Sequence, residues 1–312
     1  MVYHNNELTL IIILFILLTI TLEEGHSSTK NIKTEIIAHR GASLLAPENT
    51  NAAFDKAIEL NADRLELDVQ LSQDGKIVVI HDHTVDRTTN GSGLVKDLSL
   101  RNLKQLNAGS WFDLKYSDEK IPTLDEILNK YIKKIDLLIE IKYPQLYPGI
   151  EKKIAKAVKS DLNKNNIIIQ SFSEASLKLI KKFLPDIPTC LLISGFEFNE
   201  INQPKLERIS SYADYISLPQ MLISSELVKT AQKIGLGVYG WNVNTQGEYL
   251  KMQQMRVNGI ITNMSNTSSF SKNNIGDSSF IKARESKFKF TDLLNLFNLI
   301  TKEAKIFLNT FK

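Results

Sequence analysis

One stretch of the chain, residues 36–86, decides the fold, because short polar motifs interrupt or follow its strand-forming runs. The motifs are IIAHRG (36–41), PENT (47–50), ELD (66–68) and HD (81–82). A β-rich run, Glu35–Ala38, leads directly into His39 and Arg40, and a second run, Arg64–Leu71, contains the ELD motif. We therefore expect polar side chains from consecutive strands to meet.

Glu66 and Asp68 form a candidate metal site. They stand two residues apart in a predicted strand, so their carboxylates point to one face while apolar Leu65, Leu67 and Val69 point to the other. Two carboxylates side by side repel each other unless a cation lies between them. Hard divalent ions take oxygen ligands, so the pair predicts a Mg²⁺ or Ca²⁺ site.

A tight turn at residues 73–76 follows this strand, because Asp-Gly supplies the positive φ that hairpins need. Pairing outward from the turn places Leu71 opposite Val78 and Asp68 opposite His81. This register brings a second histidine next to the carboxylates.

From residue 35 onward, predicted strands alternate with predicted helices. The later strands are expected at 136–141, 167–171, 189–193, 215–218, 237–241 and 259–262. Helix starts are indicated by Pro47, which suits a first helical turn, by Ser173 as a cap, and by Thr245 and Glu248 at capping-box spacing. This alternation indicates a mainly parallel sheet with covering helices.

The region of about 230 residues is near the size of an α/β fold of the (β/α)8 TIM type. Because the hairpin adds a ninth strand without a crossover helix, we expect the barrel, residues 35–265, to be irregular around its second and third strands. A small insertion, residues 83–121, follows the third strand and should form a lid or side wall over the site. Trp111 and Phe112 in it either pack this subdomain, which is the favoured interpretation, or contact substrate.

The ordered set of motifs resembles the glycerophosphodiester phosphodiesterase family over residues 35–265. The motifs that extend the resemblance are DRTT (86–89), IPTL (121–124), EIK (140–142), QSF (170–172) and WNVN (241–244). Any one of them is weak alone, but their order and spacing are specific together. The resemblance implies a barrel fold and a metal-dependent phosphodiesterase.

Phosphodiester cleavage needs a base, an acid, and positive charge near the phosphoryl oxygens. His39 and His81 are the candidate acid–base pair, because imidazole titrates near neutrality and both residues end strand runs beside carboxylates. Arg40 and Lys142 are expected to bind the phosphate, arginine through two hydrogen bonds and lysine as a point charge.

The predicted metal ligands are Glu66, Asp68 and Glu140, and the cofactor is Mg²⁺ or Ca²⁺. Glu140 ends a predicted strand, and the resemblance implies a metal-binding glutamate in its EIK motif. On its own, this motif would fit a surface pair at a strand end equally well.

Three further residues are expected in the substrate pocket. The resemblance implies that Glu48 lies near the site, where it orients Arg40 or His39; capping of the following helix is an equal alternative. Ser171 and Trp241 stand at later strand ends and are expected to line the pocket. Trp241 also fits plain core packing.

The last predicted strand departs from the family pattern. That pattern often has Thr-Asp followed closely by Pro, whereas this chain has Thr262-Asn263-Met264-Ser265. Asn263 keeps hydrogen-bonding capacity but loses a charge. We expect an effect on fine positioning near the first strand, and hence on rate.

The resemblance favours hydrolysis of glycerophosphodiesters to glycerol 3-phosphate and an alcohol. One alternative keeps the chemistry and takes lysophospholipids, as a lysophospholipase D-type enzyme. Another is a membrane-tethered binding protein with a dead site, against which the intact histidines and carboxylates argue. A net charge of +3 over 312 residues is too small to indicate a nucleic-acid partner, and the only cysteine, Cys190, excludes an intrachain disulfide.

The two ends of the chain differ from the barrel in composition. Residues 1–34 contain the apolar run Leu8 to Leu22, which suits either a cleaved signal peptide or an N-terminal anchor. Residues 266–312 contain an Asn- and Ser-rich linker and then a basic amphipathic helix, which either lies on an anionic membrane or docks on protein. We expect an exported, periplasmic or extracellular protein associated with a membrane surface; the sequence leaves its oligomeric state open.

Overall fold

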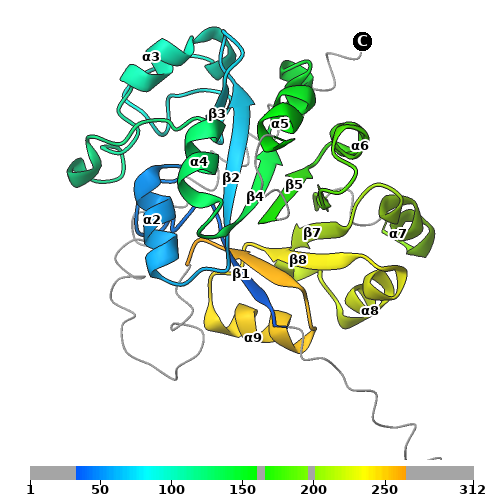
Figure 1. The fold of residues 1–312 in the computed structure, drawn as a ribbon. Helices are drawn as coiled ribbons and strands as arrows, with labels where there is room; N and C mark the ends of the chain where they lie inside the picture. The colour runs from blue at the N-terminus through cyan, green and yellow to red at the C-terminus, as the bar shows by residue number, and fades with distance from the viewer. Residues whose placement is uncertain (1–32, 160–165, 196–200, 265–312) are drawn as a thin grey trace, which may run out of the picture. The chain divides into compact units, whose positions relative to one another are not determined.

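The computed structural model describes residues 33–159, 166–195 and 201–264. In these ranges eight parallel strands close into a barrel, and helices lie around its outside (Figure 1). The sheet runs β1-β9-β8-β7-β6-β5-β4-β2-β3, and β1 also pairs with β2, which closes the ring. Strand β3 is antiparallel to β2. The predicted barrel, irregular around its second and third strands, is therefore confirmed.

The bounds of the strands agree closely with those expected. The strands are β1 Glu35–Ala38, β2 Arg64–Leu71, β3 Ile77–Val79, β4 Asp136–Ile141, β5 Ile167–Ser171, β6 Thr189–Leu192, β7 Tyr215–Pro219, β8 Gly237–Trp241 and β9 Gly259–Thr262. The α-helices are α2 Asn51–Glu59, α3 Leu100–Gln105, α4 Leu124–Tyr131, α5 Ile150–Lys159, α6 Glu174–Phe183, α7 Gln203–Ser210, α8 Ser225–Ile234 and α9 Gln246–Gln254. Only β6 and β7 differ from the predicted bounds, each by one residue at its end.

The hairpin between β2 and β3 is present, but its predicted register is wrong by one residue. Leu71 pairs with Ile77 rather than Val78. The reason is a three-residue loop, in which Gly75 adopts φ 72° and the backbone N–H of Ser72 donates to the carbonyl of Lys76. His81 lies two residues beyond the end of β3 at Val79. The change of register within the strand therefore does not fix the direction of its side chain, which lies 3.2 Å from Lys142 Nζ.

Helix α2 begins at Asn51, so the expectation that Pro47 occupies its first turn is wrong. The cap is Thr50, whose hydroxyl also donates to the carbonyl of Pro47. The predicted caps at Ser173 and Thr245 are both confirmed.

Alternation along β2 separates the two sides of the barrel wall. Leu65, Leu67 and Val69 belong to a core that includes residues of α2, α4 and α5, whereas Glu66 and Asp68 point inward. An apolar layer fills the barrel interior with Ile37, Leu138, Ile168, Cys190, Tyr239 and Ile261. The polar residues follow these along the strands, at the carboxyl ends where barrel enzymes carry their sites.

The insertion after β3 packs together with β3 in a small apolar cluster. This cluster consists of Val78, Ile80, Val85, Val95, Leu103, Ala108 and Ile121. Trp111 packs edge-on against Phe112 and donates its indole N–H to the carbonyl of Ala108. These contacts agree with the packing interpretation of this aromatic pair.

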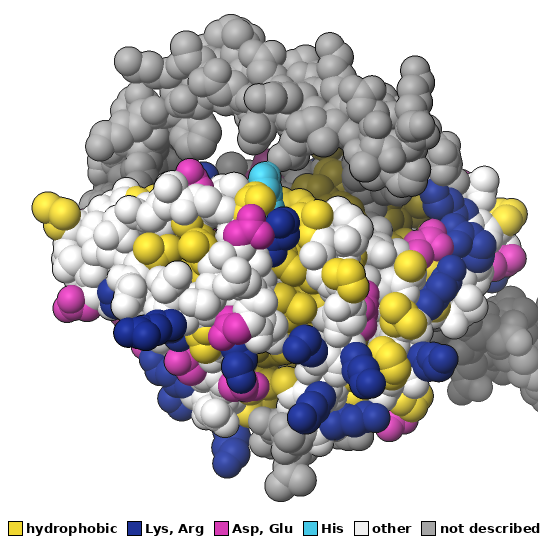
Figure 2. Space-filling view, turned by 90° about the horizontal axis from the view of Figure 1, so that it is seen from above, with side chains coloured by type: hydrophobic (Ala, Val, Ile, Leu, Met, Phe, Trp, Pro, Cys, Tyr) yellow, Lys and Arg dark blue, Asp and Glu magenta, His cyan; other side chains and the backbone are white. Residues whose placement is uncertain are grey.

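Two predicted segments contribute little or nothing to the described residues. The leader, 1–34, lies almost entirely outside them, and the linker with its basic helix, 266–312, lies wholly outside them. Among residues that are described, no helix has the length and apolar character needed to cross a bilayer. On the face drawn in Figure 2, basic and acidic side chains are interspersed.

Candidate active site

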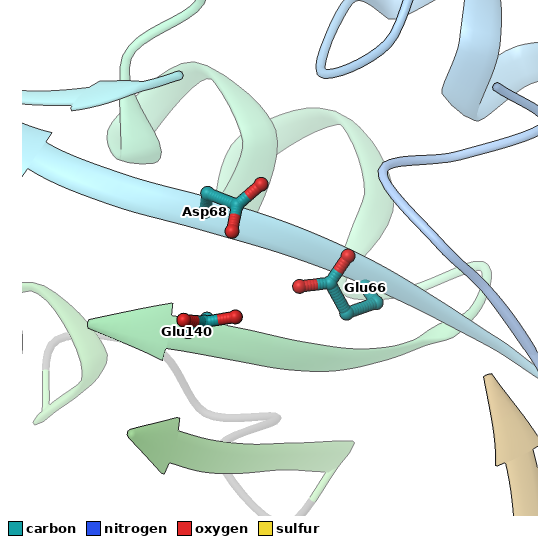
Figure 3. A group of neighbouring side chains, drawn as sticks. All are labelled: Glu66, Asp68 and Glu140. Carbon is teal, nitrogen blue, oxygen red and sulfur yellow. The ribbon is translucent and has the colours of Figure 1, made fainter. Parts of the chain in front are cut away.

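Glu66 and Asp68 of β2 and Glu140 of β4 point their carboxylates toward one another (Figure 3). One ligand oxygen from each lies within 4.8 Å of the other two, and all three side chains are buried. The parallel register of the two strands places Asp68 beside Glu140. Burial, together with the charges of Asp68 and Glu140, raises the pKa of Glu66 well above its usual value. The structure therefore brings the three predicted metal ligands together.

Arg40 and Lys142 lie against this carboxylate cluster. The Arg40 backbone N–H donates to Glu66 Oε2 at 2.8 Å, and its Nε lies 3.4 Å from Asp68 Oδ2. Lys142 Nζ donates to Glu140 Oε1 at 2.8 Å. Burial disfavours the lysine charge, but the two nearby carboxylates outweigh it and raise the pKa of Lys142. Both predicted phosphate-binding residues thus carry a positive charge at the site.

The HRG motif makes the turn that places these groups. Gly41 has φ +81°, and a Cβ there would lie 2.6 Å from the backbone carbon of Ala53 in α2. No larger side chain fits this approach. The glycine of the motif is therefore required by packing against α2.

His39 is held by the residue that departs from the family pattern. Its Nδ1 lies 2.6 Å from Asn263 Oδ1, which also accepts a hydrogen bond from Ser43 Oγ at 3.2 Å. An amide oxygen only accepts, so Nδ1 carries the proton and Nε2 keeps its lone pair. Burial and the charge of Arg40 lower the pKa of His39 to about 3. The imidazole is therefore neutral near pH 7, as a general base must be.

His81 is held by a carboxylate. Its Nδ1 lies 2.6 Å from Asp82 Oδ1, and its Nε2 lies 3.2 Å from Lys142 Nζ. Burial opposes charge on Asp82, but hydrogen bonds from His81 and Arg87 outweigh it and hold the pKa of Asp82 below its usual value. The two predicted acid–base residues thus have different partners, an amide for His39 and a carboxylate for His81.

Asn49 and Gln170 contact two of the predicted metal ligands and were not assigned from the sequence. Asn49 Nδ2 donates to Asp68 Oδ2 at 2.8 Å, and Gln170 Nε2 donates to Glu66 Oε1 at 3.3 Å. Both lie in the quoted motifs, PENT and QSF. The usable signal was position, because Gln170, like Glu140, stands one residue before the end of its predicted strand, and the structure pairs the two residues.

Glu48 accepts a hydrogen bond from Arg40 Nη1 at 2.8 Å, as the orienting interpretation requires. It also accepts two from Arg87, at 2.7 and 2.8 Å. Burial opposes its charge, but these arginines outweigh it and lower the pKa of Glu48 to about 2. Arg87 and Asp82 are further site residues that sequence reasoning did not assign, although both lie in quoted motifs.

Ser171 and Trp241 differ in what they present to the barrel interior. The Ser171 hydroxyl is fully buried, donates to the carbonyl of Ile141 and accepts from the backbone of Ser173, so its role is to hold the backbone. Trp241 packs edge-on against Phe172 with ring centroids 6.4 Å apart. Its buried indole N–H has no hydrogen-bond partner in the described part of the chain. Trp241 is therefore the better candidate for the pocket.

The neutral state of His39 predicts a pH-dependent loss of stability. Its folded pKa, about 3, lies below its ordinary value, 6.5, so between these values only the unfolded chain binds the proton. The free energy of unfolding of the natural protein, relative to His39→Gln, should therefore fall as pH drops below 6.5, by up to about 1.4 kcal/mol per pH unit.

Urea unfolding from pH 8 to pH 4 measures this difference. A second neutral replacement, His39→Asn, serves as the control and should give the same profile. A difference that stays constant over the whole range would show that burial does not suppress protonation of His39.

Residues 39–267 match the family model described as "Glycerophosphoryl diester phosphodiesterase family". YhdW of Bacillus subtilis (strain 168) is 44% identical over 227 residues, which is 73% of this chain and 93% of that protein. The glycerophosphodiester phosphodiesterase of Caldanaerobacter subterraneus subsp. tengcongensis is 43% identical over 235 residues, which is 74% of this chain and 94% of that one.

Solved structures give the same result. An Oleispira antarctica phosphodiesterase, solved in complex with the product sn-glycerol-3-phosphate, has a TM-score of 0.69 and 28% identity, and the match covers 76% of this chain and 97% of that one. A glycerophosphodiester phosphodiesterase from Agrobacterium tumefaciens str. C58 has a TM-score of 0.66 and 28% identity, covering 76% and 99%. The chain therefore belongs to the glycerophosphoryl diester phosphodiesterase family.

Proposed function

We propose that this phosphodiesterase hydrolyses glycerophosphodiesters to glycerol 3-phosphate and an alcohol in a reaction that depends on a divalent cation. The observation that carries the proposal is the convergence of three buried carboxylates, Glu66, Asp68 and Glu140, beside two fixed cations and two histidines. Family membership supports the phosphodiester substrate, and the product complex of the Oleispira antarctica relative supports glycerol 3-phosphate as the product.

The donor set of the site fits Mg²⁺ or Ca²⁺. All the candidate ligand atoms are carboxylate oxygens, and Asp68 Oδ1 is buried without a hydrogen-bond partner among the described residues. With every carboxylate ionised, the site and its surroundings would carry five negative charges against three cationic side chains, an excess that a bound cation would offset. These are Glu48, Glu66, Asp68, Asp82 and Glu140 with Arg40, Arg87 and Lys142. A bound divalent cation would polarise the phosphoryl oxygens and lower the pKa of a coordinated hydroxyl or water.

The chain's own groups have separate tasks in this proposal. His39 offers the lone pair of Nε2 as the base, because Asn263 holds its proton on Nδ1. His81 serves as the acid for the leaving alkoxide, with Asp82 fixing its orientation through Nδ1. Arg40 and Lys142 stabilise charge that grows on the phosphoryl group in the transition state.

One observation favours the lysophospholipid alternative as a second candidate. Most of the large apolar side chains that the described residues expose lie in the connections that follow strands β1, β3, β4, β5 and β7. These are Leu44, Leu45, Trp111, Leu114, Leu146, Phe172 and Met221. Strand ends of this kind surround the site, so an acyl chain on the substrate would find apolar contacts there.

The proposal extends to location. The apolar leader and the basic amphipathic tail are each weak membrane signals, and two weak signals together anchor a protein stably. We therefore propose an exported enzyme held at a membrane surface.

Substrate and metal dependence are tested together on the purified protein. We expect turnover of glycerophosphocholine and glycerophosphoethanolamine, its loss in EDTA, and its return with Mg²⁺ or Ca²⁺. EDTA already saturated with Mg²⁺ is the control. Full activity after exhaustive chelation would contradict the proposed metal dependence. A kcat/KM for lysophosphatidylcholine higher than that for the glycerophosphodiesters would favour the lysophospholipid alternative.

His39→Ala and His81→Ala should each lower kcat by about 10²–10⁴-fold, because each removes a general acid or base. Circular dichroism and thermal melting check that each variant is folded. Near-normal kcat in a folded variant would exclude that histidine from proton transfer.

Fractionation of cells tests the location. The full chain should be found with membranes, a variant without residues 1–30 should be retained in the cytoplasm or released, and a variant without 280–312 should bind membranes less. Recovery of the full chain only from the soluble cytoplasmic fraction would contradict both parts of the proposal.

A further inference from the structure

Arg87, at the start of the insertion, connects two parts of the site. Its Nη1 and Nη2 donate to the two oxygens of Glu48 at 2.7 and 2.8 Å. Its Nε and Nη2 donate to the two oxygens of Asp82 at 2.6 and 3.0 Å. One guanidinium thus makes bidentate contacts with carboxylates from two separate loops.

Each of these carboxylates also holds a residue of the reaction. Glu48 Oε1 accepts from Arg40 Nη1, and Asp82 Oδ1 lies 2.6 Å from His81 Nδ1. The contacts therefore form a continuous path from a phosphate-binding group, through Arg87, to an acid–base group. Charge-assisted bidentate hydrogen bonds form only within a small range of distances and angles. A shift of Arg87 would therefore move Glu48 and Asp82, and with them Arg40 and His81.

A simpler explanation is that Arg87 only fastens the insertion to the barrel. The insertion, however, packs against Val78 of β3 and is tied to the rest of the domain by bonds independent of Arg87. These include the bond from the Tyr116 hydroxyl to the carbonyl of Leu45, the bond from the backbone N–H of Gln73 to the carbonyl of Leu98, and the bond from the backbone N–H of Leu100 to Asp74 Oδ1. The Arg87 side chain is 44% exposed, whereas its partners Glu48 and Asp82 are 11% and 25% exposed, so these ion pairs are partly buried and also contribute to stability. Fastening alone does not require two bidentate contacts.

We propose that Arg87 is a positioning residue that sets Arg40 through Glu48 and His81 through Asp82, and so aligns phosphate binding with proton transfer. The inference rests on the phosphodiesterase function proposed above and adds a residue to that site. Lysine cannot replace it, because an ammonium is a point charge that does not reach two carboxylates bidentately.

The test compares Arg87→Met with Arg101→Met in the full chain. Arg101 lies exposed on α3 of the same insertion, so the control removes the same side chain outside the site. We expect kcat to fall roughly 10–100-fold in Arg87→Met, as for displaced catalytic groups, and to stay at the natural value in Arg101→Met. Arg87→Lys should melt like the natural protein and still have reduced kcat, which also covers the case that Arg87→Met does not fold.

A double-mutant cycle separates positioning from fastening. If Arg87 acts through Asp82, Arg87→Met combined with Asp82→Asn should lower kcat by less than the product of the single effects. Unchanged kcat in Arg87→Lys, or a loss of melting temperature without a loss of kcat, would overturn the proposal. An inactive natural protein would instead overturn the proposed function, so the two failures are distinguishable.

Discussion

Electrostatic repulsion among Glu66, Asp68 and Glu140 is the constraint on which the rest of the site depends. At separations up to 4.8 Å, each pair of full charges would repel by at least about 3.5 kcal/mol at an effective dielectric constant of about 20. This repulsion is larger than the stabilisation of about 0–1 kcal/mol that an exposed ion pair provides. The strands of the barrel hold the three carboxylates in place, and hydrogen-bond donors surround them. Two of these donors, Arg40 and Lys142, are also positively charged. The two residues proposed to bind the phosphodiester are thus groups that the protein already needs to hold its own carboxylates.

Much of the fold was predictable because its signals are local. Each of these signals depends on a few neighbouring residues. Examples are the shared face of Glu66 and Asp68 within β2, the alternation of strands and helices, and the cap at Ser173. The hairpin register was not predictable to the same degree, because two- and three-residue loops both use a glycine at positive φ. The choice between them depends on side-chain bonds at Ser72 that a sequence pattern does not specify.

The same distinction holds within the site. Its reacting groups were assigned from residue type and position, and the structure brings His39, His81 and the three carboxylates to one end of the barrel. The residues that orient them, such as Arg87 and Asn49, were not assigned. Their importance comes from contacts across loops, and an arginine in a long insertion is usually just a solvated charge.

The partnership of the first and last strands has a consequence for biosynthesis. β1 pairs with β9, and the imidazole that follows β1 is oriented by Asn263, which lies 224 positions further along the chain. A nascent polypeptide on the ribosome therefore contains all three carboxylates of the cluster long before it can orient His39. The site is complete only once the last strand has docked against the first.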